Sequence, residues 1–499
     1  MMRFYDRKDE IASLEQLWKS SKKRSQFATV SGMRRVGKTC LLTEFAKGKR
    51  AVYLFIQKAM PSNVAQYIAD SARKSGVPIL GSPSLSEAFS AIFDYAKQEQ
   101  TLLIIDEIQN FSPSAKDAFS IIQSQWDRIE NTGGIMLVAS GSYDSALNDI
   151  FEGRSMPLYG RPTAKLRIRP FGFGIVQEML SDMGQKGLFA QAEAYMLFGG
   201  LPRYYALMDA SGAKTWQGAL EKMLFGQNTV LESEIRSIFY DEFKSGAPRQ
   251  LSIISAIASG KTSLNNISNA TGIPITQLPR YLELLSRKYG FVEKELPLGA
   301  NKKEGTWKVK DSFASFYFRF IYPRNREQLA LEAGAVGKNI AENSQAFFGK
   351  RFEKLCAELL PSSGLVPFEP VRVSYWRNRQ GEDIDIVVEG KREFLLVSCK
   401  WRNKGIANAD AHELVALGKK ACLKGKLHHL IICKGAQKGR ELCGVRVAGF
   451  AELVSHMNST EGTPLQAAGY HCHSVEILPV RPRRKRRGIS QLAINGKAR

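Results

Sequence analysis

This chain has few histidines, no cysteine pairs at metal-binding spacing and no long apolar run, and each shortage excludes a class of protein. All six histidines follow residue 411, and the seven cysteines are scattered without the close pairs of a zinc site. An odd number of scattered cysteines also argues against a disulfide framework. We therefore expect reduced thiols, as in a cytoplasmic protein.

Segments that direct a chain to a membrane are missing as well. No apolar stretch reaches the length of about 18 residues that a membrane helix needs, and the N-terminus lacks the apolar run of a signal peptide. Acidic residues are in deficit, because 48 Asp and Glu face 71 Lys and Arg, for a net charge of +23. Such an excess attracts polyanions, nucleic acid first and an anionic membrane surface second. The sequence predicts no membrane span, and its first candidate partner is DNA.

The pattern of apolar residues divides the 499-residue chain into several units. Near the N-terminus short apolar runs predict strands at 27–30, 52–56, 102–105, 135–139 and 164–168. Amphipathic segments between them predict helices at 39–47, 62–75 and 85–99. Continuous apolar strands separated by helices indicate an α/β fold with a parallel sheet covered on both faces.

The remaining chain changes character twice. Residues 175–245 are predicted to be helical. Helices at 251–258, 264–270 and 276–287, followed by strands at 291–295 and 306–309, match the order of a winged helix. A second α/β unit is predicted from a helix at 345–360, strands at 384–388, 394–399 and 430–433, and a helix near 410–423. Residues 481–487 hold six cations in seven positions and predict a disordered basic tail.

Residues 32–39, Gly-Met-Arg-Arg-Val-Gly-Lys-Thr, match the P-loop (Walker A) pattern at every fixed position. Glycines let the backbone approach phosphates closely and aim its N–H groups at them. Lys38 is expected to reach the β- and γ-phosphates, and the Thr39 hydroxyl to ligate Mg²⁺. The strand before the loop and the helix after it are both predicted. The residues expected to surround the phosphates are Gly32, Met33, Arg34, Arg35, Val36, Gly37, Lys38, Thr39 and Cys40.

Acidic and polar residues at the ends of later strands fit the same site. Asp106 and Glu107 end the strand at 102–105, where Asp106 is expected to hold Mg²⁺ and Glu107 to orient the attacking water (Walker B). The alternative for this pair is a helix cap. Ser142, after the strand at 135–139, would sense the γ-phosphate unless it only makes a turn. Arg161 would stabilise transition-state charge, in the same chain or from a neighbouring subunit, unless it is a surface salt-bridge residue.

These motifs together resemble the archaeal-type ATPase family of P-loop proteins, close to the AAA+ and STAND ATPases. The residues that carry the resemblance are Phe4-Tyr-Asp-Arg7 with Glu10, Gly32 to Thr39, Ile104 to Glu107, Ser140 to Ser142, Leu158-Tyr-Gly-Arg161 and Gly199-Gly-Leu-Pro-Arg203. The resemblance implies ATP rather than GTP. It also implies a winged helix followed by a domain similar to restriction endonucleases. The domains expected are a P-loop ATPase core (1–175), a helical lid (176–245), a winged helix (246–325), a nuclease-like α/β domain (326–480) and a basic tail (481–499).

The winged helix is the first candidate for contact with double-stranded DNA. Its third helix would enter the major groove, and its wing would touch the backbone. Gln277 and Arg280 lie on that helix, and Lys302 and Lys303 lie on the wing. Amide and guanidinium groups can bond to base edges, whereas lysine mainly neutralises phosphate. Winged helices also bind other proteins, so a protein partner is the alternative.

The last domain resembles the PD-(D/E)XK nuclease fold. The matching residues are Glu353 in the helix at 345–360, Asp385 in the strand at 384–388, and Lys400 just after the strand at 394–399. In such a site carboxylates bind Mg²⁺, and the lysine positions or activates water. Ser398 stands where the pattern has an acid, and a hydroxyl is a weaker ligand for a hard dication. Glu393 or Asp383 is the candidate replacement, and a binding role is favoured over cleavage.

The sequence therefore predicts a cytoplasmic, Mg²⁺-dependent ATPase whose nucleotide state controls a DNA-binding half. Two alternatives stay open. One is a nucleotide-gated regulatory switch with negligible turnover, and the other is an ATP-dependent DNA nuclease. A homo-oligomer is expected if Arg161 acts on a neighbouring subunit.

Overall fold

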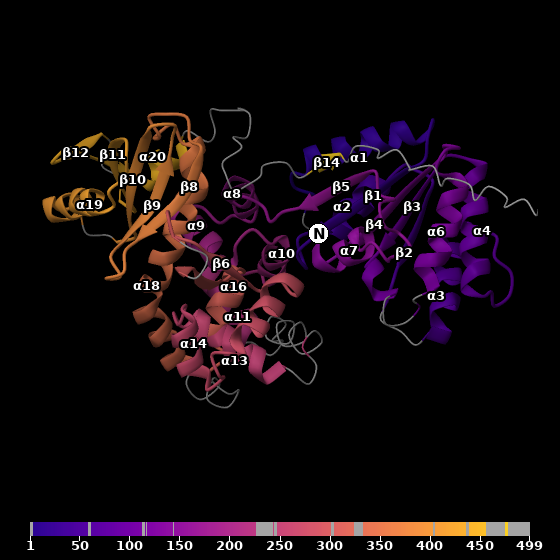
Figure 1. The fold of residues 1–499 in the computed structure, drawn as a ribbon, viewed down its shortest axis with the longest axis horizontal. Coiled ribbons are helices and arrows are strands. Elements are labelled where there is room, and N and C mark those ends of the chain that lie inside the picture. The colour runs from indigo at the N-terminus through magenta and orange to yellow at the C-terminus, as the bar shows by residue number, and fades with distance from the viewer. Residues whose placement is uncertain are drawn as a thin grey trace, which may run out of the picture.

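A computed structural model describes residues 3–57, 61–111, 115, 117–142, 144–225, 243, 247–300, 304–323, 333–402, 405–435, 439–455 and 475–477. Two six-stranded sheets and one two-stranded sheet organise these residues. Figure 1 shows the two large sheets at opposite ends of the molecule, with a group of helices between them.

The N-terminal sheet has the strand order β14-β5-β1-β4-β3-β2. Its strands are β1 (Gln26–Gly32), β2 (Ala51–Phe55), β3 (Thr101–Asp106), β4 (Ile135–Gly141), β5 (Ala164–Ile168) and β14 (Val475–Ile477). The first five pair in parallel, as the continuous apolar runs predicted. Because β1 is central, the loop that follows it lies between β5 and β4 at the carboxyl edge of the sheet.

Helices cover both faces of this sheet. The helices are α1 (Lys8–Ser21), α2 (Lys38–Ala46), α3 (Pro61–Lys74), α4 (Leu85–Gln98), α6 (Asp117–Ile129) and α7 (Asp144–Glu152), with a 3-10 turn η1 (Ile108–Asn110). Successive strand residues alternate between faces. Ile104 belongs to the same apolar cluster as Leu41 of α2, whereas Ile105 belongs to the cluster that contains Phe89 of α4. Both faces are therefore buried, which explains why the strands are apolar throughout.

One segment of the range predicted for the last domain pairs with the N-terminal sheet. β14 lies within 326–480, yet it pairs antiparallel with β5 of the N-terminal sheet, Val475 opposite Leu166. The outer edge of β5 would otherwise present backbone groups that β14 bonds. A strand of three residues has no periodic pattern, so its sequence gave no sign of this pairing.

The described part of the range 175–225 is helical, as predicted, whereas most of the predicted range 226–245 lies outside the described residues. Helices α8 (Phe173–Asp182), α9 (Leu188–Phe198), α10 (Pro202–Ala210) and α11 (Trp216–Phe225) come first. The next elements are α13 (Ala247–Ala258), α14 (Leu264–Thr271), α15 (Leu278–Glu283), a π-helical turn η3 (Leu284–Lys288), and strands β6 (Val292–Glu295) and β7 (Thr306–Val309). β6 and β7 form an antiparallel pair. The order of three helices and a two-stranded ribbon is the predicted one.

A long helix leads into the C-terminal sheet. The elements are α16 (Ser312–Phe320), α18 (Ala333–Leu359), η5 (Leu360–Ser362), β8 (Arg372–Arg377), β9 (Asp383–Glu389), β10 (Glu393–Lys400), α19 (Asn408–Lys420), β11 (Lys426–Cys433), β12 (Arg440–Leu442), β13 (Val445–Gly449) and α20 (Phe450–Ser455). The strand order is β12-β13-β11-β10-β9-β8. Leu355 of α18 and Phe450 of α20 pack on one face, whereas Leu414 of α19 packs on the other.

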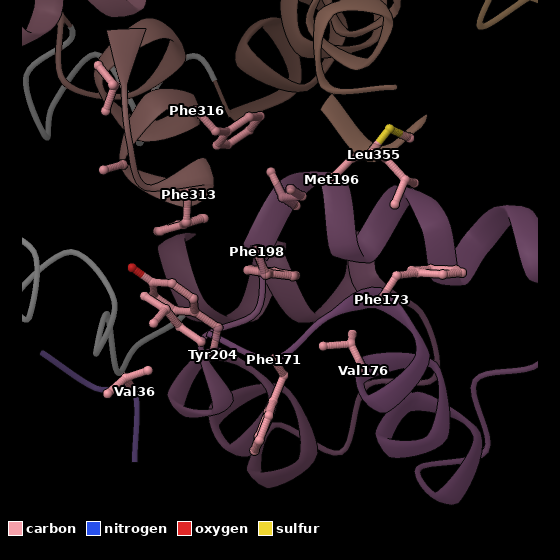
Figure 2. Close-up of a cluster of buried hydrophobic side chains, with 14 of the residues drawn as sticks. Val36, Phe171, Phe173, Val176, Met196, Phe198, Tyr204, Phe313, Phe316 and Leu355 are labelled. Atoms are coloured by element: carbon pink, nitrogen blue, oxygen red, sulfur yellow. The ribbon is translucent and has the colours of Figure 1, made fainter. Parts of the chain in front are cut away.

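One apolar core joins the N-terminal domain to the C-terminal sheet. Figure 2 shows side chains from the P-loop, from α8 to α10, from α16 and from α18 in one cluster. The ring of Phe313 stacks on Phe198 with centroids 5.5 Å apart, and Phe316 packs against Phe347 at 5.7 Å. Phe347 lies on α18 itself, so the helical region is packed against α18 through aromatic contacts.

Candidate functional site

The P-loop lies at the carboxyl end of β1, where the chain must pass very close to β5. A Cβ atom added at Gly32 would lie 2.6 Å from the Ile168 carbonyl oxygen, so only glycine fits. Gly37 has a φ of 99°, a left-handed conformation that other residues rarely adopt. Val36 is fully buried, whereas Thr39 and Cys40 are exposed at the start of α2. The loop is thus shaped as a cradle in front of a helix N-terminus.

Lys38 is held within the loop that it is predicted to serve. Its ammonium donates to the carbonyl oxygens of Gly32 at 3.0 Å and Met33 at 3.2 Å, and lies 3.4 Å from the Ser142 Oγ. The side chain is 5% exposed. Phosphate oxygens carry negative charge, so they would be stronger partners for this buried ammonium than the two carbonyl oxygens.

Asp106 is the centre of a hydroxyl network. The Thr39 Oγ1 donates to its Oδ2 at 2.8 Å, the Tyr53 hydroxyl donates to the same oxygen at 2.6 Å, and Ser140 donates to Oδ1. Burial, and then the charge of Asp106, raise the pKa of Tyr53, which therefore stays a neutral donor. Tyr53 and Ser140 were not predicted as site residues. They follow from the register of the sheet, in which β2 and β4 both neighbour β3.

Glu107 lies directly after Asp106 in a left-handed conformation with φ 56°. The Ser142 hydroxyl donates to its Oε1 at 2.6 Å, and the Gln109 side-chain amide donates to its Oε2. Ser142 thus connects Glu107 to Lys38, as it is within 3.4 Å of the lysine ammonium. Lys38, Thr39, Asp106, Glu107 and Ser142, which were predicted separately, form one connected site. Gln109 was not predicted.

A buried ion pair from the N-terminal segment supports the P-loop from behind. Arg7 contacts Glu10 with Nη1 to Oε1 at 3.1 Å, and both side chains are below 10% exposed. Its Nη2 donates to the Val36 carbonyl at 3.2 Å and to the Arg169 carbonyl at 2.8 Å. Burial lowers the pKa of Arg7 against the opposing effect of Glu10. Arg7 therefore joins the P-loop to the segment after β5, a role that its position in the sequence did not predict.

Arg161 does not lie at the P-loop of its own chain. It precedes β5, at the amino edge of the sheet, whereas the P-loop is at the carboxyl edge. Its guanidinium makes two hydrogen bonds of 2.9 Å to the carboxylate of Asp127 on α6. Within one chain this matches the alternative expectation, a salt-bridge residue. Parallel strands place residues before and after a strand at opposite edges, a separation that a linear motif does not reveal.

The start of α10 closes the site from the helical region. Pro202 has its Cγ 3.7 Å from the position of a Cβ on Gly37. Arg203 follows Pro202 in the first turn of α10 and is exposed.

The residues present fit a nucleoside triphosphate with Mg²⁺. Gly32 and Gly37 allow the tight course of the loop, and Lys38 supplies the cation. The Thr39 hydroxyl and the Asp106 carboxylate are 2.8 Å apart, and both are oxygen donors that Mg²⁺ accepts. These two residues would hold the metal.

The C-terminal domain brings its predicted residues together in a second polar cluster. The backbone N–H of Cys399 donates to the Asp385 Oδ2 at 2.8 Å, and the Ser398 hydroxyl is 3.4 Å from that oxygen. Glu353 and Lys400 both lie near Asp385, because the charge of Asp385 helps to raise the pKa of Glu353 and the charge of Lys400 opposes the rise that burial causes in the pKa of Asp385. Glu393 lies at the other end of β10, where His428 contacts it at 2.7 Å, so it does not replace the missing acid.

A lysine lies among these carboxylates. The Lys350 ammonium is 2.9 Å from Glu353 and 3.8 Å from Asp383. Burial alone lowers the pKa of Lys350, but the charges of Glu353, Asp383 and Asp385 outweigh it and the pKa is raised. Burial, and then the charge of Asp385, raise the pKa of Glu353 to about 8. Over the described residues, no three His, Cys, Asp or Glu side chains form a metal-binding group.

The structure describes only two of the four residues predicted to contact DNA. Gln277 and Arg280 are exposed at the start of the third helix. The other end of that helix, the turn η3, contacts α7 of the N-terminal domain, and the β6–β7 ribbon packs on β8, where Thr306 lies 3.2 Å from the Tyr375 hydroxyl. Lys302, Lys303 and the basic segment 481–487 lie outside the described residues. No helix in the described part is both long and apolar enough to cross a membrane.

Comparisons with known proteins agree with the fold. Residues 24–175 match the family described as an AAA domain, and residues 317–414 match a family described as archaeal and bacterial proteins of unknown function. The first match contains the P-loop, Asp106, Glu107 and Ser142. Residues 24–175 are therefore an AAA-type P-loop ATPase domain, and the second match begins within α16 and extends into α19 of the C-terminal sheet domain.

Two individual proteins are similar over most of their own length. An uncharacterized protein of Methanocaldococcus jannaschii is 27% identical over 410 residues, which cover 80% of this chain and 88% of that protein. The Walker-type ATPase of Pyrococcus abyssi has a similar fold, with a TM-score of 0.51 and 19% identity, over 63% of this chain and 96% of that one. This chain has the architecture of a P-loop ATPase joined to a C-terminal α/β domain.

Proposed function

We propose that the protein binds ATP with Mg²⁺ and hydrolyses it at the P-loop. The observation that carries this proposal is the connected network at the carboxyl ends of β1, β3 and β4. In it Thr39 bonds to Asp106 at 2.8 Å, and Ser142 links Lys38 to Glu107. A phosphate-binding cation, two metal-holding oxygens and a base then converge on one point.

Each residue has a role that its contacts suit. Lys38 binds the β- and γ-phosphate oxygens in place of the Gly32 and Met33 carbonyls. Mg²⁺, when held by Thr39 and Asp106, supplies neutralising charge to the phosphate oxygens. Glu107 orients the attacking water, and Ser142 transmits the state of the γ-phosphate to Glu107 through their 2.6 Å hydrogen bond.

The first test is Lys38→Ala in the full chain, with ATP hydrolysis measured at steady state. We expect turnover to fall by a factor of about a hundred or more, because a charge-assisted contact to the transferred phosphate is lost. Lys47→Ala is the matched control, since Lys47 flanks the other end of α2 with a side chain 68% exposed. Hydrolysis undiminished in Lys38→Ala would exclude this site as the ATPase centre.

A second candidate is a nucleotide-gated switch with negligible turnover. The observation that favours it is that both Glu107 oxygens already accept hydrogen bonds, from Ser142 and Gln109. Glu107 must leave Gln109 before it orients water. Gln109→Ala is then expected to raise basal hydrolysis several-fold, whereas slow hydrolysis with tight ATP binding in wild type and in this variant would favour the switch.

We also propose that the basic C-terminal half binds double-stranded DNA and does not cleave it. Exposed Gln277 and Arg280 would contact the duplex, joined by Lys302 and Lys303. Arg280→Ala should weaken binding by about tenfold or less if it contacts one base or phosphate. Binding that does not depend on salt would contradict a backbone-dominated contact.

The C-terminal carboxylate cluster is the place to test cleavage. The Lys350 ammonium already lies beside Glu353, and Ser398 stands in the position of an acid. We therefore expect plasmid DNA to stay intact with Mg²⁺ or Mn²⁺, with and without ATP. Cutting by the wild type that disappears in Asp385→Ala would instead establish the ATP-dependent nuclease.

A further inference from the structure

A cavity of about 700 Å³ lies between the P-loop and α18. Its walls come from the P-loop, the segment after β5, the junction of α9 and α10, the turn η3, the start of α16 and one face of α18. Nine of the residues that line it are lysines or arginines, and three are acidic. The cavity is therefore strongly electropositive and has the volume of a small-molecule site.

Two of the three acids that line this cavity accept hydrogen bonds from neutral donors, whereas the charge of the third, Glu293, acts on Arg351 and Lys354. Glu358 accepts hydrogen bonds from the Tyr195 hydroxyl at 2.9 Å and from the backbone N–H of Phe173 at 3.2 Å. Asp311 caps α16, accepting from the Ala314 N–H at 2.6 Å. These two carboxylates are engaged in fixing helix ends and do not form ion pairs with the cations of the cavity among the described residues.

Three cations facing the cavity, Lys310, Arg351 and Lys354, have no ion pair among the described residues. Within the described chain no hydrogen bond or ion pair reaches the Lys354 ammonium or the Lys310 ammonium, although both residues line the cavity. Arg351 has one hydrogen bond, to the Ser312 hydroxyl at 3.4 Å, and stands 5.4 Å from the Phe347 ring centre. Burial lowers the pKa of Arg351 to about 10 and lowers the pKa of Lys354, whose neighbour Arg351 adds to the effect.

Cations held close together repel one another unless an anion neutralises them. Arg351 and Lys354 are three residues apart on α18 and share a face of that helix. Lys310 adds a third cation from the segment before α16. A single carboxylate could pair with one of these groups, whereas a chain of phosphates offers charge to all three.

We propose that this cavity is a second anion-binding site and that it takes a ligand carrying several phosphates, separate from the nucleotide on the P-loop. Lys310, Arg351 and Lys354 are its cationic contacts. The P-loop and Ser142 also line the cavity, so the two sites adjoin, but none of these three cations belongs to the Lys38 to Glu107 network. The free energy of binding comes from replacing repulsion among cations with charge-assisted hydrogen bonds to phosphate.

The test uses inorganic tripolyphosphate and isothermal titration calorimetry on the full chain. Lys38→Ala removes the P-loop contribution, so the remaining heat reports the cavity. We expect one class of site in Lys38→Ala. Adding Lys354→Met should weaken it by about ten- to a hundredfold, as expected for losing one charged contact. Lys354→Arg keeps the charge and should keep binding within a few-fold.

Lys419→Met in the same Lys38→Ala background is the matched control, because Lys419 is exposed on α19, away from the cavity. It should leave tripolyphosphate affinity unchanged. If Lys38→Ala abolishes all tripolyphosphate binding, the cavity belongs to the P-loop site and the proposal fails. It also fails if Lys354→Met and Lys419→Met behave alike. Absence of ATP hydrolysis by the wild-type chain would contradict the proposed function without affecting this result.

Discussion

The P-loop site and the C-terminal carboxylate cluster contain similar groups in opposite arrangements. Both contain lysine, acidic residues and a serine hydroxyl. At the P-loop the Lys38 ammonium bonds to the carbonyls of Gly32 and Met33, while the Asp106 carboxylate receives hydroxyl donors. In the C-terminal cluster the Lys350 ammonium lies directly on Glu353, at 2.9 Å.

This difference decides which site suits a metal and phosphates. Neutral donors hold Asp106 in place and leave its negative charge for a cation. In the other cluster the protein supplies the cation itself, so an incoming metal would have to displace Lys350. The presence of acids and a lysine in a sequence therefore does not define a metal site. The partner of each charge in the folded chain does.

Glu107→Gln gives the largest effect that would sharpen this comparison. The amide keeps the shape of the side chain but cannot act as a base, so ATP hydrolysis should fall by about 10²- to 10⁴-fold while ATP binding is retained. Steady-state hydrolysis and equilibrium binding measure the two effects. Glu99→Gln is the control, because Glu99 is 75% exposed and outside the site. Equal activity of Glu107→Gln and wild type would remove the catalytic difference between the two clusters.

Arg7→Met tests whether the P-loop depends on the buried ion pair behind it. Glu10 would be left as a buried charge without its partner, so the free energy of unfolding should fall by about 3–5 kcal/mol. Urea unfolding of the full chain measures the change, and ATP affinity should weaken as well. Arg7→Met with Glu10→Leu should recover part of the stability. A double variant as unstable as the single one would show that the lost contacts to Val36 and Arg169 matter more.

The pH dependence of stability tests the C-terminal cluster. The pKa of Glu353 is about 8 in the folded chain, above its ordinary value of 4.5, so the folded state holds the proton more tightly between these values. Its contribution to stability is complete below about pH 4.5 and is lost as the pH rises through about 8. We expect a loss on the order of 3 kcal/mol over this window in urea unfolding.

Glu353→Gln is the control for that measurement. The amide cannot ionise, so the variant should lack the fall in stability between pH 5 and pH 8 that the wild type shows. A slope of equal size in both proteins would assign the pH dependence to other groups. It would also weaken the view that burial beside Asp385 governs this cluster.

Arg161→Ala should have the smallest effect. Its contact with Asp127 is at the edge of the sheet away from the P-loop, and such partly exposed pairs contribute about 0–1 kcal/mol. ATP hydrolysis should stay within about twofold of wild type at every protein concentration. A large loss, together with hydrolysis per chain that rises with protein concentration, would restore a role for Arg161 at a neighbouring subunit.

The sequence by itself determined the local structure of the N-terminal domain and the chemistry of its loop. Apolar runs predicted the strands around Val30, Ile105 and Leu137, because a sheet covered on both faces buries every strand residue. The spacing of Gly32, Gly37, Lys38 and Thr39 fixed the phosphate-binding loop, since the function of that loop resides in its own backbone. Asp106 and Glu107 followed from their position at a strand end.

Only the tertiary structure decided which distant groups meet. Tyr53 and Ser140 reach Asp106 through the strand order β4-β3-β2, and Arg161 is carried to the opposite edge by the direction of β5. β14 joins the N-terminal sheet although it follows the C-terminal domain in sequence. Pairing between strands and the packing of α18 depend on contacts far apart in the chain. Local propensity and motif spacing hold no information about these long-range contacts, because the contacts form only when the whole core is buried.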